Sequence, residues 1–485
     1  MILDMTLVTG ILGLQKKDSF SKIIMKNYIY LKFNDTLDKG FKKLKGSFGG
    51  VIFIIDNKNK LLGTVSDGDL RRGILKGIPL NSKIEDVMNK NPTFIYSDEL
   101  KRKSLNKSNI NLGKAMDRPL IIPVVDNKKK ILSIINSEKF LDILVKKNHN
   151  YKINLKLKKP HVLIVGGAGY IGSVLTSKLI KKNYRIKIVD KILYEKNSLK
   201  KFNKTKNFSL IKKDICDPEV QINALKDVDA VIFLAEIVGD PSCAAKPEDA
   251  LKTNYIALSS MANLCSYMNI NRFIYTSSCS VYGANNNSKN TLDESSPLNP
   301  VSHYARMKVL SEKALLSQSN ILFSPTILRL ATVYGPSFRN RFDLVVNIFA
   351  RDAHFKKGVK VFGGNQWRPN IHVEDVANAI IKTLESPLNK VEKQIFNISN
   401  DKENYSINEL AKKTKKIFRG CKIKILKGAA DKRDYKVNSK KIKNAIGFNT
   451  NYTIENALKK FKKIFESKKI KNPNLKKFSN YDSLK

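Results

Sequence analysis

One short stretch, residues 162–190, constrains the fold more than any other part of the chain. An apolar run leads into glycines at Gly166, Gly169 and Gly172, and a pattern of helical period follows. A second apolar run then ends at Asp190. Strand, glycine turn, helix and second strand predict a βαβ unit, in which glycine permits a tight turn and a close approach of backbone to a ligand.

The ligand that suits this turn is a dinucleotide. The helix N-terminus offers free N–H groups and partial positive charge to a pyrophosphate, with Tyr170 and Ile171 in its first turn. Asp190 is placed to accept hydrogen bonds from an adenosine ribose, and its charge would repel a 2′-phosphate. The stretch therefore predicts NAD rather than NADP as the cofactor.

Composition limits the remaining choices. The 485 residues carry a formal charge of +46, but the lysines are spread along the chain and no basic cluster alternates with aromatic residues. We therefore expect a lysine-rich solvated surface and no nucleic-acid partner. No apolar run is long enough to cross a bilayer, and Met1–Leu14 makes a poor signal peptide. Five scattered cysteines suit reduced thiols, so we expect a cytoplasmic protein with no metal site.

The N-terminal third contains an internal repeat. The run Val51–Asp56 recurs as Ile121–Asp126, and each copy continues through a lysine-rich turn into a second apolar run and a helix pattern. Each copy predicts a hairpin followed by a helix. Because one copy cannot cover both faces of so small a sheet, we expect the two copies to pack together in an α+β module over residues 25–150.

This module resembles a tandem pair of cystathionine-β-synthase (CBS) domains, chiefly through the segment Gly63–Arg72. The resemblance implies that Ser66 and Asp69 contact the ribose of an adenine nucleotide. The second copy has Asn136 and Lys139 at the matching positions, so one nucleotide per chain is expected. A purely structural or dimerising module is the alternative.

The rest of the chain alternates strand and helix patterns, which predicts a doubly wound parallel sheet of the Rossmann type. The more irregular sequence from Asp293 onward suits a small substrate-binding lobe beside that sheet. The expected segments are an N-terminal extension (1–24), the tandem module (25–150), a linker (151–160), the nucleotide-binding domain (161–465) and a loose basic tail (466–485).

Tyr304 and Lys308 are the leading candidates for chemistry. Their i, i+4 spacing places both side chains on one face of the helix expected over 304–316. A phenol is a poor base at neutral pH, but a nearby ammonium stabilises the phenolate. Ser278 ends the fifth strand, where α/β sheets place their ligands, and could hold a substrate hydroxyl against the Tyr304 oxygen.

Together these motifs resemble an extended short-chain dehydrogenase/reductase of the nucleotide-sugar epimerase/dehydratase group, over about residues 161–465. The resemblance implies a catalytic set of Ser278, Tyr304 and Lys308, the last two also touching the cofactor. It implies substrate-diphosphate contacts at Arg368 and Arg433, for which bidentate arginine geometry is well suited. It adds further cofactor contacts at Asp214, Ile215, Leu234, Ala235 and Asn254.

The reaction expected is epimerisation of a nucleotide-activated sugar, by oxidation and then reduction at one carbinol carbon. Members that dehydrate carry an Asp-Glu pair after the catalytic serine, and members that decarboxylate carry a Glu there. This chain has Cys279 and Ser280 instead. Asp190 favours NAD and hence a C4 epimerase, in which the Tyr304 phenolate takes the hydroxyl proton. A 4-ketosugar reductase using NAD(P)H and a non-catalytic nucleotide-sensing regulator remain the alternatives.

Three further expectations complete the sequence analysis. Glu236 stands where small residues are usual in this group and can reach the nicotinamide or the sugar. Cys279 alternates with its serine neighbours, so we expect a buried thiol that faces away from the site. Two chains are expected to pair, as a homodimer or within a larger homo-oligomer, through the helices containing 257–267 and 304–316.

Overall fold

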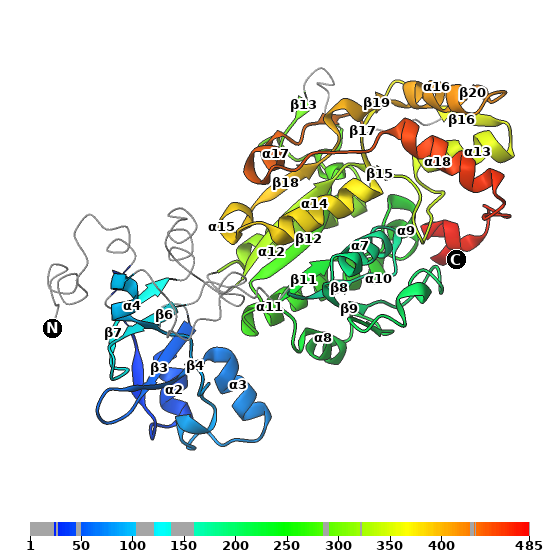
Figure 1. The fold of residues 1–485 in the computed structure, drawn as a ribbon. Helices are drawn as coiled ribbons and strands as arrows, with labels where there is room; N and C mark the ends of the chain where they lie inside the picture. Colours follow the sequence, from blue (N-terminus) through cyan, green and yellow to red (C-terminus); the bar gives the residue numbers. More distant parts are fainter. Residues whose placement is uncertain are drawn as a thin grey trace. The chain divides into compact units, whose positions relative to one another are not determined.

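The structure is a computed structural model. It describes residues 24–25, 28–44, 50–102, 121–136, 160–284, 291–320, 323–426, 431 and 433–484. The chain divides into two compact units, one formed mainly by residues 1–159 and the other by residues 160–485 apart from two short segments. Figure 1 shows the helices and strands of both units.

The N-terminal unit consists of two small sheets with short helices. Within the described residues, one sheet has the strand order β2-β3-β4 and the other β1-β7-β6-β5. The elements are β1 (Ile24–Met25), β2 (Tyr30–Lys32), α2 (Leu37–Leu44), β3 (Val51–Ile55), β4 (Leu61–Ser66), α3 (Asp67–Leu75), β5 (Ile95–Tyr96), α4 (Ser97–Arg102), β6 (Ile121–Val125) and β7 (Ile131–Asn136). The predicted end of the N-terminal extension therefore falls inside β1.

The internal repeat predicted from the sequence is confirmed. Strand β2 is parallel to β3 and β3 antiparallel to β4, and β5, β6 and β7 repeat these pairings. Each hairpin turn contains one left-handed residue, Asn59 (φ 64°) or Lys129 (φ 63°). Side chains from both copies, including Phe53, Phe94 and Ile134, share one apolar cluster. The two copies thus cover each other, because neither sheet could bury its apolar face alone.

The second unit is built on a parallel sheet. In the described residues seven strands follow the order β10-β9-β8-β11-β12-β14-β18, and all their pairings are parallel. The strands are β8 (His161–Val165), β9 (Arg185–Val189), β10 (Phe208–Ile211), β11 (Ala230–Phe233), β12 (Arg272–Ser278), β14 (Ser324–Leu330) and β18 (Ile395–Ile398). The chain reverses its direction of travel across the sheet between β8 and β11, which is where such sheets bind ligands.

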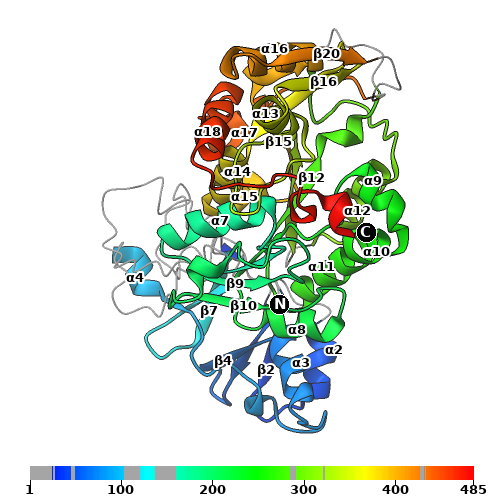
Figure 2. The same ribbon diagram turned by 90° about the vertical axis from the view of Figure 1, so that its right-hand side faces the viewer.

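Helices cover both faces of this sheet, which is seen edge-on in Figure 2. One face carries α7 (Tyr170–Lys181) and α14 (Val373–Glu385), which pack side by side, with α15 (Leu388–Val391) and α17 (Lys440–Ile446). The other carries α8 (Pro218–Leu225), α10 (Pro247–Leu251), the π-helix η4 (Lys252–Ala257), α11 (Leu258–Tyr267) and α12 (His303–Ser317). No helix in the described residues has the length and apolar character that a membrane crossing requires.

A smaller lobe stands beyond the carboxyl ends of the strands. It gathers α13 (Val345–Phe355), β16 (Gly358–Phe362), β17 (Trp367–His372), α16 (Ile407–Ile417), β20 (Lys422–Leu426) and α18 (Ile454–Glu466) around one apolar cluster. The sequence analysis assigned everything after Asp293 to such a lobe. That assignment was too broad, because the chain returns to the main sheet twice, as β14 and β18.

The expectation of a loose C-terminal tail is wrong. Ile470 and Phe478 are buried in the cluster of the lobe, and the Phe342 N–H donates to the Phe478 carbonyl at 2.8 Å. Lys477 forms an ion pair with Glu195 at 2.5 Å. The segment ends in η7 (Lys476–Phe478) and α19 (Asn480–Leu484). Its few apolar residues are enough to anchor it, although lysine and asparagine dominate its composition.

Candidate active site

The glycine turn between β8 and α7 leaves no room for side chains. Gly166 has φ 86°, and a Cβ there would lie 2.6 Å from the Ala235 backbone nitrogen. A Cβ on Gly172 would lie 2.4 Å from the Gly166 carbonyl oxygen. Gly169 caps α7 without a side chain, so that the N-terminus of this helix opens into a cavity of about 780 Å³. The turn therefore presents backbone N–H groups where the sequence predicts a diphosphate.

A second cavity of about 170 Å³ adjoins the turn. It is lined by seven of the predicted cofactor contacts, namely Gly166, Gly169, Asp190, Asp214, Ile215, Leu234 and Ala235. The Asp190 carboxylate accepts hydrogen bonds from the backbone N–H groups of Ala168 (2.8 Å) and Ile192 (2.7 Å), and burial raises its pKa. Asp214 forms an ion pair with Lys191. The structure thus brings together residues from four strand ends.

Asn254 does not fit the predicted role. It lies in η4 and is buried, and its amide bonds on both sides to the main chain of Ile237, accepting from the N–H and donating to the carbonyl at 2.9 Å each. It lines neither cavity. Its side chain instead fixes the loop after β11, where Glu236 sits, and so acts on the site only through that loop.

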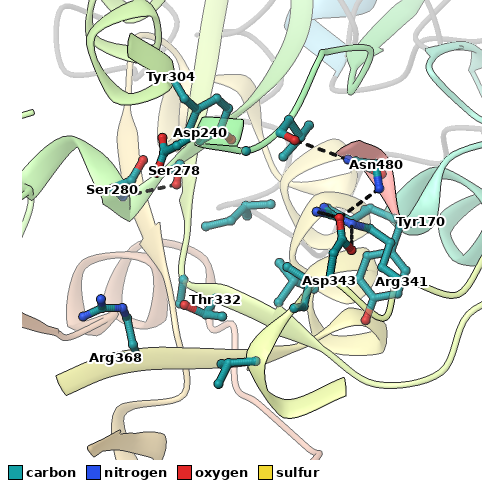
Figure 3. A pocket seen from close by; sticks show the side chains of 18 of the residues that line it. Tyr170, Asp240, Ser278, Ser280, Tyr304, Thr332, Arg341, Asp343, Arg368 and Asn480 are labelled. Atoms are coloured by element: carbon teal, nitrogen blue, oxygen red, sulfur yellow. Dashed lines mark hydrogen bonds and ion pairs between the residues drawn. The ribbon is translucent and has the colours of Figure 1, made fainter. Parts of the chain in front are cut away.

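The candidate catalytic residues meet on one wall of the larger cavity (Figure 3). Ser278 ends β12, and its hydroxyl accepts from the Ser280 N–H at 3.2 Å. Ser302 caps α12, which places Tyr304 in its first turn and Lys308 one turn later. The Lys308 nitrogen lies 5.6 Å from the centre of the Tyr304 ring and donates to the Thr276 carbonyl at 2.6 Å.

The electrostatics of this wall differ from the expectation. Lys308 forms a buried ion pair with Glu236, a partner that the sequence did not predict for it. Burial raises the pKa of the Tyr304 phenol well above its ordinary value, and the negative charge of Glu236 raises it further. The simple expectation that Lys308 stabilises the phenolate therefore omits a carboxylate that opposes it.

Cys279 lies behind this wall, as predicted. It is fully buried in an apolar cluster and its thiol donates to the Arg329 carbonyl at 3.3 Å. Burial raises the pKa of the thiol, which keeps it protonated and unreactive. Ser280 lines the cavity instead, with a buried hydroxyl that has no hydrogen-bond partner.

Two arginines distant in the sequence meet at the far end of the cavity. Arg368, on β17, and Arg433 both contact the Asp431 carboxylate, at 2.9 Å and 2.5 Å. Arg433 also lies 3.3 Å from Asp240. Burial raises the pKa of Asp431, but the hydrogen bonds and charges of the arginines hold it well below its usual range. This end of the cavity is therefore a cluster of cations already partly neutralised by carboxylates.

Sequence analysis missed a group of residues on the loop after β15 (Thr332–Tyr334). Arg341 pairs with Asp343 at 2.9 Å, and Asp343 accepts from the backbone N–H of Asn480 at 3.0 Å. Arg339 is 2% exposed, stacks 4.1 Å from the ring of Tyr194, and its Nε and Nη2 have no hydrogen-bond partner. Burial and the charge of Arg341 lower the pKa of Arg339 to about 10.

The only sequence signal for this group was the run Arg339-Asn-Arg-Phe-Asp343, which looks like a surface loop. Nothing in that run indicates burial, and the partner Asn480 comes from a segment predicted to be loose. Figure 3 shows Arg341, Asp343 and Asn480 together on the side of the cavity away from Arg368.

In the N-terminal unit, Ser66 and Asp69 bond to each other. The Ser66 N–H and hydroxyl donate to the Asp69 carboxylate at 2.8 Å and 2.7 Å, and the Asp69 N–H returns a bond to the hydroxyl. Together they cap α3, and Arg72 donates to Asp69 at 2.6 Å. Lys139 lies outside the described residues, as does the side chain of Asn136.

The residues of the larger unit fit a dinucleotide. The glycine turn is a cradle that a Cβ would fill, Asp190 lines the adjoining cavity, and Arg339 has two buried guanidinium nitrogens without a hydrogen-bond partner that suit an anion. The fold and site thus define a dinucleotide-dependent enzyme of the Rossmann type, with a serine, a tyrosine and a lysine in the cavity that the glycine turn opens into.

Comparison with known proteins gives the family. Residues 162–399 match the model of the NAD dependent epimerase/dehydratase family, and residues 20–76 match that of the CBS domain. A candidate UDP-glucose 4-epimerase of Methanocaldococcus jannaschii is 30% identical over 254 residues, which are 51% of this chain and 79% of that protein. The chain belongs to the NAD-dependent epimerase/dehydratase family and carries a CBS domain ahead of the enzyme.

Two solved structures agree. UDP-N-acetylglucosamine 4-epimerase from Methanobrevibacter ruminantium, in complex with UDP-N-acetylmuramic acid, is 27% identical with a TM-score of 0.57, covering 64% of this chain and 99% of that one. UDP-glucose 4-epimerase from Thermotoga maritima, with UDP-glucose, is 25% identical with a TM-score of 0.56, covering 63% and 99%. The predicted fold class, the CBS relationship and the NAD dependence of the family are confirmed.

Proposed function

We propose that the chain is an NAD-dependent epimerase that inverts C4 of a nucleotide-activated sugar. The observation that carries this proposal is the single cavity of about 780 Å³ that extends from the glycine turn, past Ser278 and Tyr304, to Arg368 and Arg433. A dinucleotide at one end and a sugar diphosphate at the other would place the sugar against Tyr304. The relatives named as 4-epimerases support the same reaction.

Separate residues of the chain transfer the proton, bind the diphosphate and bind the cofactor. Tyr304 takes the proton of the C4 hydroxyl and later returns a proton to the same oxygen, while Ser278 orients that hydroxyl. Arg368 and Arg433 hold the diphosphate, and the glycine turn, Asp190 and Arg339 hold the cofactor. The NAD held by these residues would supply reversible hydride exchange with C4, so that hydride could return to the opposite face of the sugar.

Two other reactions of the family, dehydration and decarboxylation, are disfavoured by the residues that follow Ser278. Dehydration and decarboxylation call for carboxylates directly after the catalytic serine. Here Cys279 faces away from the cavity, and Ser280 offers only a hydroxyl. A 4-ketosugar reductase uses the same Ser278, Tyr304 and Lys308 and is the second candidate, favoured by no observation beyond these shared residues.

The test is turnover of a small panel of nucleotide sugars. The full chain is incubated with UDP-glucose, UDP-N-acetylglucosamine or UDP-glucuronic acid, with NAD, and the products are identified by proton NMR. An epimerase yields the C4 epimer with no net build-up of NADH. A reductase leaves these sugars unchanged and oxidises NADH only when a 4-ketosugar is supplied.

We also propose that two chains pair through the helices on one face of the sheet. Leu251, Ile256 and Leu310 are about half exposed (46%, 51% and 51%) on α10, η4 and α12, which lie side by side. Exposed aliphatic side chains grouped on adjacent helices are typical of an interface. Light scattering of the purified chain should give the mass of a dimer or a multiple of it, and Leu310→Glu should give a monomer.

A further inference from the structure

The buried ion pair between Glu236 and Lys308 is the least expected feature of the active site. Glu236 lies three residues after the end of β11, and its side chain is 4% exposed while that of Lys308 is 3% exposed. The carboxylate also accepts a hydrogen bond from the Tyr275 hydroxyl at 2.8 Å. Glu236 lines both cavities, so it stands between the glycine turn and the catalytic wall.

The neighbouring carboxylates form ion pairs with other residues and not with Lys308. The charge of Glu312 acts on Lys308, but Glu312 is paired with Arg329 at 2.7 Å, and Asp240, the first residue of α9 (Asp240–Ala245), is paired with Arg433. The groups that act on the Tyr304 phenol are Glu236, Cys243 and Asp240, which disfavour its ionisation, and Arg341, which favours it. Lys308 is bonded only to Glu236 and the Thr276 carbonyl among the contacts described.

The pair gives the catalytic wall a net charge of zero. Inside a buried cavity, charges interact far more strongly than in water, so the presence or absence of one carboxylate there is felt by every ionic ligand. The nicotinamide ring is a cation when oxidised and neutral when reduced. With Lys308 alone the wall would repel the oxidised ring, whereas Glu236 removes that repulsion.

We propose that Glu236 is a positioning residue whose carboxylate holds Lys308 and supplies the counter-charge that favours the oxidised dinucleotide over the reduced one. This inference rests on the proposed function, because an epimerase must rest with its cofactor oxidised, whereas a reductase must accept it reduced. Because the Lys308 nitrogen that Glu236 holds lies 5.6 Å from the centre of the Tyr304 ring, the carboxylate also opposes ionisation of the phenol, and a bound oxidised ring would offset that effect.

The test compares Glu236→Gln with Tyr275→Phe in the full chain. Dissociation constants for NAD and NADH are measured by titration calorimetry without any sugar. In Glu236→Gln the ratio of the NAD to the NADH constant should rise about tenfold, because one buried charge has been lost. Tyr275→Phe removes the hydrogen bond but keeps the charge, and should leave the ratio within twofold.

The double variant Glu236→Gln, Lys308→Met restores a neutral wall and provides the internal control. Its ratio should return to that of the wild-type chain, although its turnover should be lost. It also keeps the test decisive if the single variant fails to fold, since it leaves no unpaired buried charge.

A spectroscopic titration tests the second consequence. The ultraviolet difference between each protein and its Tyr304→Phe counterpart, recorded with NAD bound, reports ionisation of Tyr304. In Glu236→Gln the phenolate should appear at lower pH than in the wild type. An unchanged cofactor ratio together with an unchanged titration would overturn the proposal, as would a folded Glu236→Gln chain that binds neither form of the cofactor. Because no sugar is used, failure of the epimerase assignment would leave these results intact.

Discussion

The predicted nucleotide site of the CBS module and the cavity of the NAD-dependent epimerase/dehydratase domain differ in whether their polar side chains have hydrogen-bond partners. In the module, Ser66 and Asp69 bond to each other and to the start of α3. In the cavity, among the described residues, the Ser280 hydroxyl and two nitrogens of Arg339 are buried without a hydrogen-bond partner. The hydrogen bonds of Ser66 and Asp69 are satisfied within the helix cap, whereas the cavity contains polar groups whose hydrogen bonds a ligand would satisfy.

This difference shows that a structure can distinguish residues that bind a ligand from residues that cap a helix, which a sequence motif alone cannot do. A buried polar group without a partner costs free energy in the unliganded protein, so it indicates a ligand. A serine and an aspartate three residues apart satisfy one another at a helix start whether or not a nucleotide binds. Contact between a nucleotide and Ser66 or Asp69 therefore stays a prediction.

The largest effect is expected for Tyr304→Phe. Turnover of the nucleotide sugar should fall about 100- to 10,000-fold, because only the oxygen that moves the proton is lost. The affinity for NAD, measured by calorimetry, should stay within a few-fold of wild type. A variant that retains a near wild-type rate would show that the acid–base group lies elsewhere in the cavity.

A smaller effect is expected for Arg368→Ala and Arg433→Ala. Each should weaken binding of the nucleotide sugar about ten- to a hundredfold, because a charge-assisted bond to a diphosphate is lost. NAD binding should be spared. The exposed Arg419 provides the matched control, since Arg419→Ala removes an equal charge from the surface. If all three variants bind the sugar nucleotide alike, Arg368 and Arg433 do not bind its diphosphate and serve only to pair with Asp431.

Arg339→Met distinguishes a ligand site from a structural arginine. The guanidinium is buried without partners for two of its nitrogens, so the substitution should not lower the melting temperature of the ligand-free chain. NAD affinity should fall about tenfold, and the stabilisation by NAD should shrink accordingly. A clear loss of stability without NAD would instead mean that Arg339 supports the fold.

The smallest effect is expected in the module. Ser66→Ala removes the cap of α3 and should lower the stability of that unit by about 1 kcal/mol, measured by chemical unfolding. If the same residues hold one adenine nucleotide per chain, Asp69→Ala should also abolish binding of AMP, ADP or ATP to the full protein. Loss of stability with unchanged nucleotide binding would leave these residues as a cap alone.

Much of the active site could be predicted because local sequence determines it. The glycine turn needs residues without a Cβ, and the spacing of Tyr304 and Lys308 places them on one helix face in any helix. Strand ends follow from apolar runs, which is how Asp190 was found, whereas Asp214 and Leu234 were predicted from the resemblance to the epimerase/dehydratase group. No sequence pattern shows that the Asn254 amide bonds to the Ile237 main chain, so this contact was not predicted.

The sequence by itself determined the two-part organisation, the parallel sheet, the NAD-type turn and the Ser278, Tyr304 and Lys308 set, since each depends on local spacing and periodicity. Only the tertiary structure decided which charges meet. The pairing of Lys308 with Glu236, the convergence of Arg368 and Arg433 on Asp431, and the packing of the C-terminal segment beside Asp343 join residues far apart in the chain. Such pairings depend on burial and on distance in space, and neither is written in the spacing of residues along the chain.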